Sequence, residues 1–269
     1  MSNITDSGFT LTVDATSDVG IKKYYFTKGN NGIYYHTNSL ANSANDNSYR
    51  YSGANPNNYV CFGSDATTCP SVNLYRIIGV FNNEVKLIKA TSLGNYMWDS
   101  GNDIEWSTSD INNRLNNSYL NSLGSTWQEK IVNHIYYVGG YSTTDATSRE
   151  FYKAESSGTS WNGKIGLMYV NDFGFAASTT YWRTDLGSFS SFATDNDWLF
   201  LGSDEWTITP SLEYGGSLGN IYIIFNFSGG YIAYGGADTS NVARPVFYLN
   251  SNVTYISGVG TQSDPIRIR

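Results

Sequence analysis

Charge, histidine and long apolar runs are all scarce in this chain of 269 residues. Charged residues make up 14% of it, well below the usual quarter, and its net charge is −7. Lysine and arginine are scattered singly. Because nucleic-acid affinity comes largely from phosphate neutralisation, we expect no nucleic-acid partner. No apolar run approaches the roughly 20 residues needed to span a bilayer, so we expect no transmembrane segment.

Short catalytic motifs are missing too. The chain contains no His-Glu-x-x-His, Gly-x-Ser-x-Gly or Cys-x-x-Cys sequence and no phosphate-cradling glycine loop. Of its two histidines, His134 is expected to be structural and His36 to be solvated in a linker. Glycoside hydrolysis needs two carboxylates at a set separation, which a sequence does not show. We therefore expect a protein that is not an enzyme and has no cofactor, with a glycan-acting hydrolase as the weaker alternative.

Metal ligands are sparse as well. A zinc site would need four ligands with recognisable spacing, and neither histidine is near a cysteine in the sequence. The loop DSGNDIE offers oxygen ligands for calcium but does not match the EF-hand spacing, and a polar loop that caps the next helix is the favoured interpretation. The calcium candidates in this loop are Asp99, Asn102, Asp103 and Glu105.

Aromatic residues, by contrast, reach 16%, with 22 Tyr and 7 Trp among many Asn, Ser, Thr and Gly residues. Low charge with many tyrosines is common in extracellular, β-rich proteins. It is also typical of binding surfaces, because tyrosine gives a large contact area at low entropic cost. An ordinary β-rich globular protein is the alternative interpretation of this composition.

The two cysteines, Cys61 and Cys69, enclose seven residues with turn-forming Gly63-Ser64-Asp65, and Pro70 follows. We expect the loop to fold back and form a disulfide, with two free thiols as the alternative. The first residues, MSNITDSGFTLTV, lack the pattern of a signal peptide. The chain is then expected to be cytosolic or a piece of a longer secreted chain. A disulfide favours the second option and an extracellular or bacterial cell-surface location.

Hydrophobic periodicity predicts strands, then helices, then strands. Residues 7–27 alternate as two strands of a small β unit, and 28–58 are interpreted as a loop or linker. LYRIIGVF and EVKLIKAT flank Asn82-Asn83 as a hairpin. Strands are also predicted in HIYYVG and KIGLMYV, and after about residue 180 in WLFLG, EWTITP, NIYIIFNF, YIAYG, ARPVFYL and VTYIS.

Helices are predicted in the middle of the chain. Over 107–123, Ile111, Leu115, Tyr119 and Leu123 fall on one stripe, with Thr108 or Ser109 as the N-cap. Gly124 ends that helix, Ser125 opens another with Gln128 completing a capping box, and a third covers 145–155. This order predicts an α+β fold with two helices packed on one side of antiparallel sheets.

Several phrases resemble a domain of bacterial secreted and surface proteins, of the C-type-lectin-like class close to the formylglycine-generating (sulfatase-modifying) fold. The most specific are WSTSDINNRLN, at the first helix, and RPVFYL; the others are LYRIIGVF, KATSLGNYMWDS, WTITP and GVGTQSDPIRI. The resemblance implies a lectin-like domain over 59–269, preceded by a short β segment and linker over 1–58. Within that segment, the phrase TVDATSDVGIKKY resembles strands of bacterial immunoglobulin-like surface repeats.

The family's activities are carried over only where the residues match. Sulfatase-modifying enzymes use cysteines in their C-terminal half, and this chain has none after Cys69. Calcium-dependent lectins use a Trp-Asn-Asp triplet, whereas this chain has Asn196-Asp197-Trp198. Diversity-generating variable proteins share the fold, and their diversified codons cannot produce Lys, Glu, Gln, Trp or Met. The stretch 214–261 contains none of these five types, which is compatible with a diversified region.

These observations predict a non-catalytic, adhesin-like module, monomeric as a fragment, that displays an aromatic surface over about 198–240. Its partner is expected to be a protein or carbohydrate on a host or bacterial surface, because aromatic faces stack on sugars and anchor proteins. The alternative is a structural segment of a surface fibre or pilus-like protein, with the aromatics in its core. The expected ligand-binding residues are Trp198, Trp206, Tyr214, Asn220, Tyr222, Phe225, Tyr231 and Tyr234.

Overall fold

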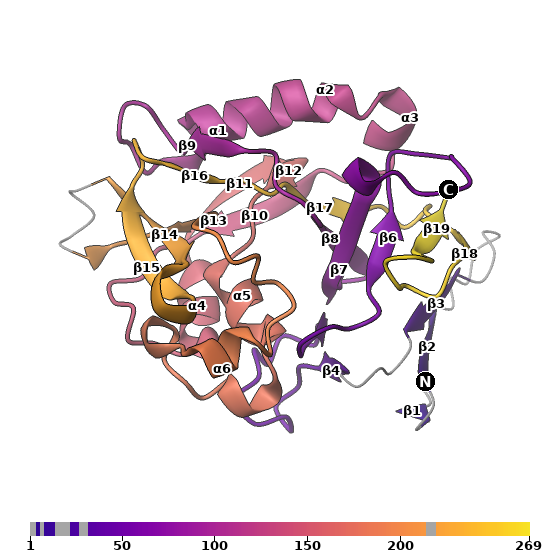
Figure 1. Ribbon diagram of the computed structural model, residues 1–269, viewed down its shortest axis with the longest axis horizontal. Helices are drawn as coiled ribbons and strands as arrows, with labels where there is room; N and C mark the ends of the chain where they lie inside the picture. The colour runs from indigo at the N-terminus through magenta and orange to yellow at the C-terminus, as the bar shows by residue number, and fades with distance from the viewer. Residues whose placement is uncertain (1–3, 6–7, 14–21, 27–31, 214–218) are drawn as a thin grey trace.

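The computed structural model describes residues 4–5, 8–13, 22–26, 32–213 and 219–269 (Figure 1). At the N-terminus, β1 (Ile4–Thr5), β2 (Gly8–Val13) and β3 (Lys22–Phe26) pair as an antiparallel three-stranded sheet. This confirms two strands within 7–27. The candidate Tyr214 lies outside the described residues.

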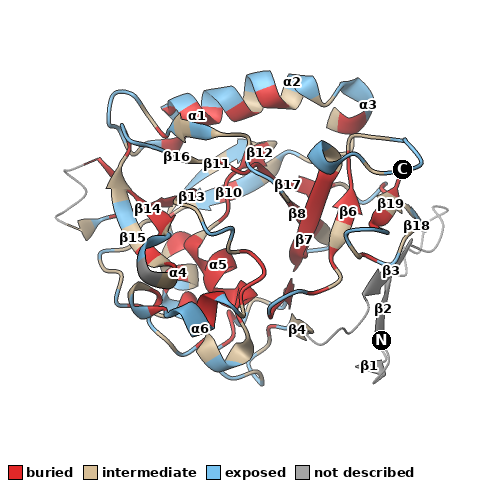
Figure 2. Ribbon diagram, viewed as in Figure 1, coloured by how far each residue is buried: buried red, intermediate tan, exposed pale blue. Residues whose placement is uncertain are grey.

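The largest sheet has nine strands and carries the centre of the core. Its central pair, β7 (Leu74–Phe81) and β8 (Glu84–Lys89), is buried almost throughout, as Figure 2 shows. The predicted hairpin is confirmed, since Asn82 and Asn83 have the positive φ angles (48° and 68°) that such a tight turn requires. The other strands are β4 (Ile33–Tyr35), β5 (Tyr49–Tyr51), β6 (Tyr59–Cys61), β12 (Ile165–Gly166), β17 (Val246–Leu249), β18 (Tyr255–Ser257) and β19 (Ile266–Ile268).

A second sheet has five strands in the order β15-β14-β13-β16-β9. Its strand β14 lies between β13 and β15 and is antiparallel to both, with Tyr222 opposite Tyr234. A separate two-stranded sheet pairs β10 (His134–Val138) with β11 (Thr159–Gly163). The five strands are β9 (Asn95–Met97), β13 (Glu205–Pro210), β14 (Asn220–Phe225), β15 (Tyr231–Gly236) and β16 (Ser240–Val242).

The helices lie in two groups rather than on one side, with α1–α3 along the top of Figure 1 and α4–α6 at the lower left. The chain is therefore α+β and mostly antiparallel, as predicted; α1–α3 lie along one side, and α4–α6 form a second group that the prediction of two helices on one side does not include. The helices are α1 (Asp110–Asn113), α2 (Leu120–Ser122), α3 (Ser125–Gln128), α4 (Ser148–Glu155), α5 (Val170–Ala176) and α6 (Ser191–Thr194).

The predicted helix over 107–123 is present, with a π-helical section, Arg114–Tyr119, between α1 and α2. Ile111, Leu115 and Tyr119 are buried. Residues four apart drift by about 40° per step around a regular α-helix, and the wider π turn keeps them on one face. Ser109 is the N-cap, accepting a hydrogen bond from the backbone of Asn112 at 3.2 Å.

The second predicted cap is wrong. Gly124, with a φ of 74°, precedes the first helical residue of α3, so Ser125 lies inside the helix and makes no side-chain cap with Gln128. The capping box instead occurs at α4, between Thr147 and Glu150. The backbone N–H of Thr147 donates a hydrogen bond to the carboxylate of Glu150. The strand predictions for WLFLG and most of KIGLMYV are also wrong, since only Ile165–Gly166 pairs within the latter.

The interpretation of 28–58 as a loop or linker is wrong where the structure describes it. Strands β4 and β5 pair with each other, and Tyr49 and Arg50 of β5 pair with Val80 and Gly79 of β7. Side chains from this region are buried in the main sheet, Arg50 among them. The sequence hides this because the strands are only three residues long and are separated by polar turns.

The expected disulfide between Cys61 and Cys69 is present. It closes the loop that leads from β6 towards β7, and Arg267 of β19 donates a hydrogen bond to the Cys61 sulfur. In the part of the chain that the structure describes, no helix has the length and apolar character needed to cross a membrane.

Candidate functional site

Half of the expected ligand-binding residues are buried, so they cannot offer a ring or amide face to a ligand. Trp198, Trp206, Asn220 and Tyr222 all lie in the interior. The Trp198 and Trp206 indoles donate to the backbone oxygens of Tyr51 and Tyr96. Packing explains this correction: the aromatics of this region fill the interior of the molecule instead of covering its surface.

The alternation within β14 does not separate a core face from a solvent face. Strand β14 lies between β13 and β15, and both of its faces are covered. Its buried side chains are Ile221, Tyr222, Ile223 and Ile224. Of the remaining candidates, Phe225 and Tyr231 are half-buried, and Tyr234 on β15 is 36% exposed.

The calcium candidates serve the backbone of their own loop. The Asp99 carboxylate accepts hydrogen bonds from the backbone of Gly101, Asp103 and Asp110. Asp103 and Glu105 accept from backbone groups two residues further on. Within the described ranges there is no cluster of three His, Cys, Asp or Glu side chains that could hold a metal ion. The loop is therefore a polar helix cap, the favoured interpretation of its sequence.

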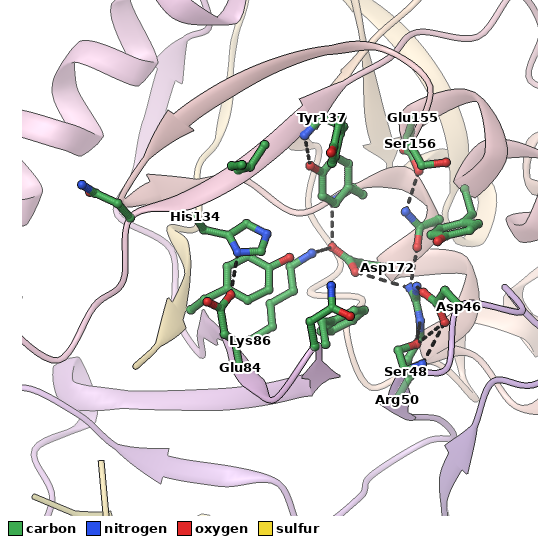
Figure 3. A pocket seen from close by; sticks show the side chains of 18 residues that line it. Asp46, Ser48, Arg50, Glu84, Lys86, His134, Tyr137, Glu155, Ser156 and Asp172 are labelled. Carbon is green, nitrogen blue, oxygen red and sulfur yellow. Dashed lines mark hydrogen bonds and ion pairs between the residues drawn. The ribbon is translucent and has the colours of Figure 1, made fainter. Parts of the chain in front are cut away.

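A cavity of about 490 Å³ lies elsewhere, between the β7–β8 turn, strand β10 and helices α4 and α5. Figure 3 shows its ionisable side chains converging from these elements. Its volume is within the usual range for small-molecule sites. The wall residues are Asp46, Ser48, Arg50, Phe81, Asn82, Glu84, Lys86, Asn133, His134, Ile135, Tyr137, Tyr152, Glu155, Ser156, Tyr169, Asn171, Asp172 and Tyr248.

The two cations of the cavity are held by carboxylates. The Lys86 ammonium lies 2.5 Å from Oδ2 of Asp172, and both side chains are 1% exposed. The Arg50 guanidinium lies 2.6 Å from Oδ2 of Asp46 and donates to Asn171 at 2.5 Å. Burial lowers the pKa of Lys86, against the opposing effect of Asp172. These ion pairs fix the floor of the cavity.

Glu155 belongs to the same buried cluster but has no cationic partner in hydrogen-bond contact among the described residues. Its Oε1 accepts hydrogen bonds from the backbone of Val170 (2.9 Å) and from the Thr209 hydroxyl, and its Oε2 from the Asn171 amide (2.6 Å). Burial raises the pKa of Glu155 to about 7, although these hydrogen bonds act in the opposite direction.

The mouth of the cavity carries a histidine–carboxylate pair. His134 Nδ1 lies 2.7 Å from Oε2 of Glu84, and the imidazole stacks on Tyr248 at 3.6 Å between ring centres. Burial and nearby Lys86 lower the pKa of His134 to about 4, so the imidazole is neutral at pH 7. Nδ1 therefore donates to Glu84, and Nε2 is an acceptor that points into the cavity in Figure 3.

The other histidine corrects a prediction. His36 is fully buried rather than solvated, and packs against Phe175 and Trp182. Its Nδ1 accepts from the backbone of Ala44 at 3.1 Å. Burial, with a contribution from Arg50, lowers the pKa of His36 to about 3, so the ring is neutral and structural.

None of the seven expected ligand-binding residues that the structure describes lines this cavity. A sequence signal for it exists, because Lys86 interrupts the apolar run EVKLIK, and Asn171-Asp172 interrupts MYVNDFGFAA. A charge inside a buried strand or helix needs a partner, and such partners often mark a functional site.

Comparison with family models, curated proteins and solved structures finds no match to this chain. The resemblance to lectin-like domains therefore stays a prediction. In the structure, Asp197 and Trp198 of the Asn-Asp-Trp triplet are buried, and the carboxylate of Asp197 accepts from the backbone of Leu199.

Proposed function

We propose that this chain is a non-catalytic binding module of an extracellular or bacterial-surface protein, and that the cavity holds a saccharide unit of its ligand. The observation that carries this proposal is the combination of tyrosine rings in the cavity wall with a floor whose charges neutralise each other. A concavity of this size takes a small group better than it takes a protein surface.

The polar groups of the cavity favour an uncharged ligand rich in hydroxyls. Arg50 and Lys86 are already held by Asp46 and Asp172, so neither is available to capture an anion. The wall carries four carboxyl groups against two cations, which repels anions further. Nε2 of His134 can accept a hydrogen bond from a sugar hydroxyl. Tyrosine rings pack against the apolar face of a sugar ring.

Binding without catalysis is supported by how the acids and hydroxyls are used. Both oxygens of Glu155 accept hydrogen bonds from the protein, which commits this carboxylate to holding the start of α5 against β13. The two serines of the wall are bonded elsewhere: the Ser48 hydroxyl donates to Asp46, and that of Ser156 to the backbone of Lys153. His134 thus faces the cavity without a serine nucleophile bonded to it among the described wall residues.

The fold assignment belongs to the same proposal. Mostly antiparallel sheets with a long helical segment, α1–α3, along one side support a C-type-lectin-like architecture (Figure 1). A diversified surface over 214–261 would have to use positions outside β14, such as the exposed ones of β15 and of the turn to β16, because β14 is buried on both faces. A near-copy of the encoding codons at the same locus would support this part, and its absence would contradict it.

Binding to an array of immobilised glycans tests the site directly. Tyr137, 45% exposed in the cavity wall, and Tyr234 on β15 are both surface tyrosines, so each can be replaced by alanine with little effect on the core. We expect Tyr137→Ala to reduce the signal of any bound glycan at least tenfold, and Tyr234→Ala to leave it within twofold.

The opposite pattern, with loss in Tyr234→Ala alone, would return the site to the C-terminal strands. A chain that binds no glycan on the array would contradict the saccharide proposal and favour the structural-segment alternative. Melting temperatures of both variants within a few degrees of the parent exclude unfolding as the cause of a lost signal.

A further inference from the structure

Lys86 and Asp172 form the most deeply buried contact between opposite charges in the cavity floor. They lie 86 residues apart, on β8 and at the start of α5. The ammonium lies over the Tyr169 ring at 4.5 Å, with Phe81 and Tyr248 also within 6 Å. Removing two charges from water is expensive, and their attraction repays the cost only where all remaining lone pairs are satisfied.

One oxygen of this pair is not satisfied. Asp172 Oδ2 accepts from both Lys86 and the backbone N–H of Tyr169, at 2.5 and 2.9 Å. Asp172 Oδ1 is buried and has no hydrogen-bond partner among the described residues, and the Arg50 guanidinium is 3.8 Å away. The carboxylate therefore has one oxygen held firmly and one held only by a distant charge.

We propose that Lys86 and Asp172 join in an intramolecular amide bond, formed with loss of one water molecule. Adding one C–O bond of about 1.2 Å to the Nζ–Oδ2 distance places Cγ within about 3.7 Å of Nζ. This approaches the separation of a near-attack geometry. The bond would replace two buried charges by a neutral group and remove the unsatisfied oxygen.

The step needs no external reagent. One proton of the Lys86 ammonium is transferred to Oδ1, the carboxylate oxygen without a hydrogen-bond partner, giving a neutral amine and a carboxylic acid. The Nζ lone pair then attacks Cγ, and the negative charge that develops on Oδ2 is stabilised by the N–H of Tyr169. A second proton passes from Nζ to Oδ1, the Cγ–Oδ1 bond breaks, and Oδ1 leaves as water into the cavity that both residues line.

Two features of the site favour this step over a lasting ion pair. Burial lowers the pKa of Lys86, which makes the neutral amine more accessible. After the bond forms, Oδ2 becomes the amide oxygen and keeps its hydrogen bond from Tyr169, so the start of α5 stays capped. The bond links strand β8 to helix α5 across the floor of the cavity. Its formation does not depend on which ligand the cavity binds.

Mass spectrometry of the intact, disulfide-reduced chain tests the proposal. We expect a mass lower than that of the sequence by one water. Trypsin should release peptides 77–89 and 165–183 joined together, without cleavage after Lys86. The control Lys86→Arg keeps the positive charge and lacks the amine nucleophile, so it should show the full sequence mass.

A parent chain of full mass that is cleaved after Lys86, even after prolonged incubation between pH 5 and 8, would overturn the proposal and leave an ordinary ion pair. Loss of water that persists in Lys86→Arg would also overturn it, because the dehydration would then lie elsewhere. A third variant, Asp172→Asn, separates the chemistry further: here the bond would release ammonia, and the mass would fall by that amount.

Discussion

Glu155 is expected to make the protein less stable as the pH rises from about 4.5 to about 7. Its carboxyl group is buried, and this raises its pKa from 4.5 to about 7 although three hydrogen bonds act in the opposite direction. In this window the unfolded chain has lost the proton that the folded chain keeps, so unfolding is favoured as the pH increases. At 1.36 kcal/mol per pKa unit, the effect on the free energy of unfolding at pH 7 is about 3 kcal/mol.

The perturbation is Glu155→Gln, which cannot ionise and retains an oxygen acceptor. Other groups, such as His134, also titrate in this window and act in the opposite direction. The informative quantity is therefore the difference in unfolding free energy between the parent and the variant, measured at several pH values. Urea unfolding followed by tryptophan fluorescence gives this difference. Between pH 4.5 and 7, the unfolding free energy of the parent should fall by about 3 kcal/mol relative to that of Glu155→Gln.

A matched control lies in the same helix. Glu150 is exposed, and its hydrogen bonds from Thr147 lower its pKa. Glu150→Gln should therefore show the opposite sign, with the contribution of the parent carboxylate present above pH 4.5 and lost as the pH falls through the lowered pKa. A difference between parent and Glu155→Gln that stays flat from pH 4.5 to 7 would refute the reasoning, because Glu155 would then be hydrated or paired.

Three further predictions concern the fold. Replacing Cys61 and Cys69 together by alanine should reduce the unfolding free energy by about 2.5 kcal/mol, as expected for so short a loop, and an unchanged urea midpoint would contradict this. Gly79→Ala should lower the unfolding free energy by about 3 kcal/mol in the same assay, because an added Cβ would lie 2.1 Å from the backbone oxygen of Tyr49. A variant of full stability would mean that β5 does not pair with β7 at this position. Tyr222→Phe should cost about 1 kcal/mol, the value of one lost hydrogen bond, and leave glycan binding unchanged, whereas a loss of binding at full stability would place Tyr222 in the site.

The parts of the fold that the sequence predicts are those with local patterns. The β7–β8 hairpin is visible in two apolar runs around Asn82-Asn83, and the helical segment in the spacing of Ile111, Leu115 and Tyr119. Neither face of β14 is polar in the sequence, which agrees with its burial in the structure. The prediction that its aromatics lie on a surface rests on composition, which does not distinguish core tyrosines from exposed ones.

The cavity could not be predicted in the same way. Its floor joins Arg50, Lys86, Glu155 and Asp172, which are spread over more than a hundred residues and meet only through sheet pairing and helix packing. Periodicity indicates which side chains face inward but not which of them meet. The one available signal was a charge within an apolar run, as at Lys86, and it identifies a residue without its partner.

A crystal structure of the chain soaked with the saccharide that binds best on the glycan array tests the proposed binding site most directly. We expect difference density for a sugar ring inside the cavity, in contact with His134 and Tyr137. Density over β15 near Tyr234, with the cavity empty, would contradict it.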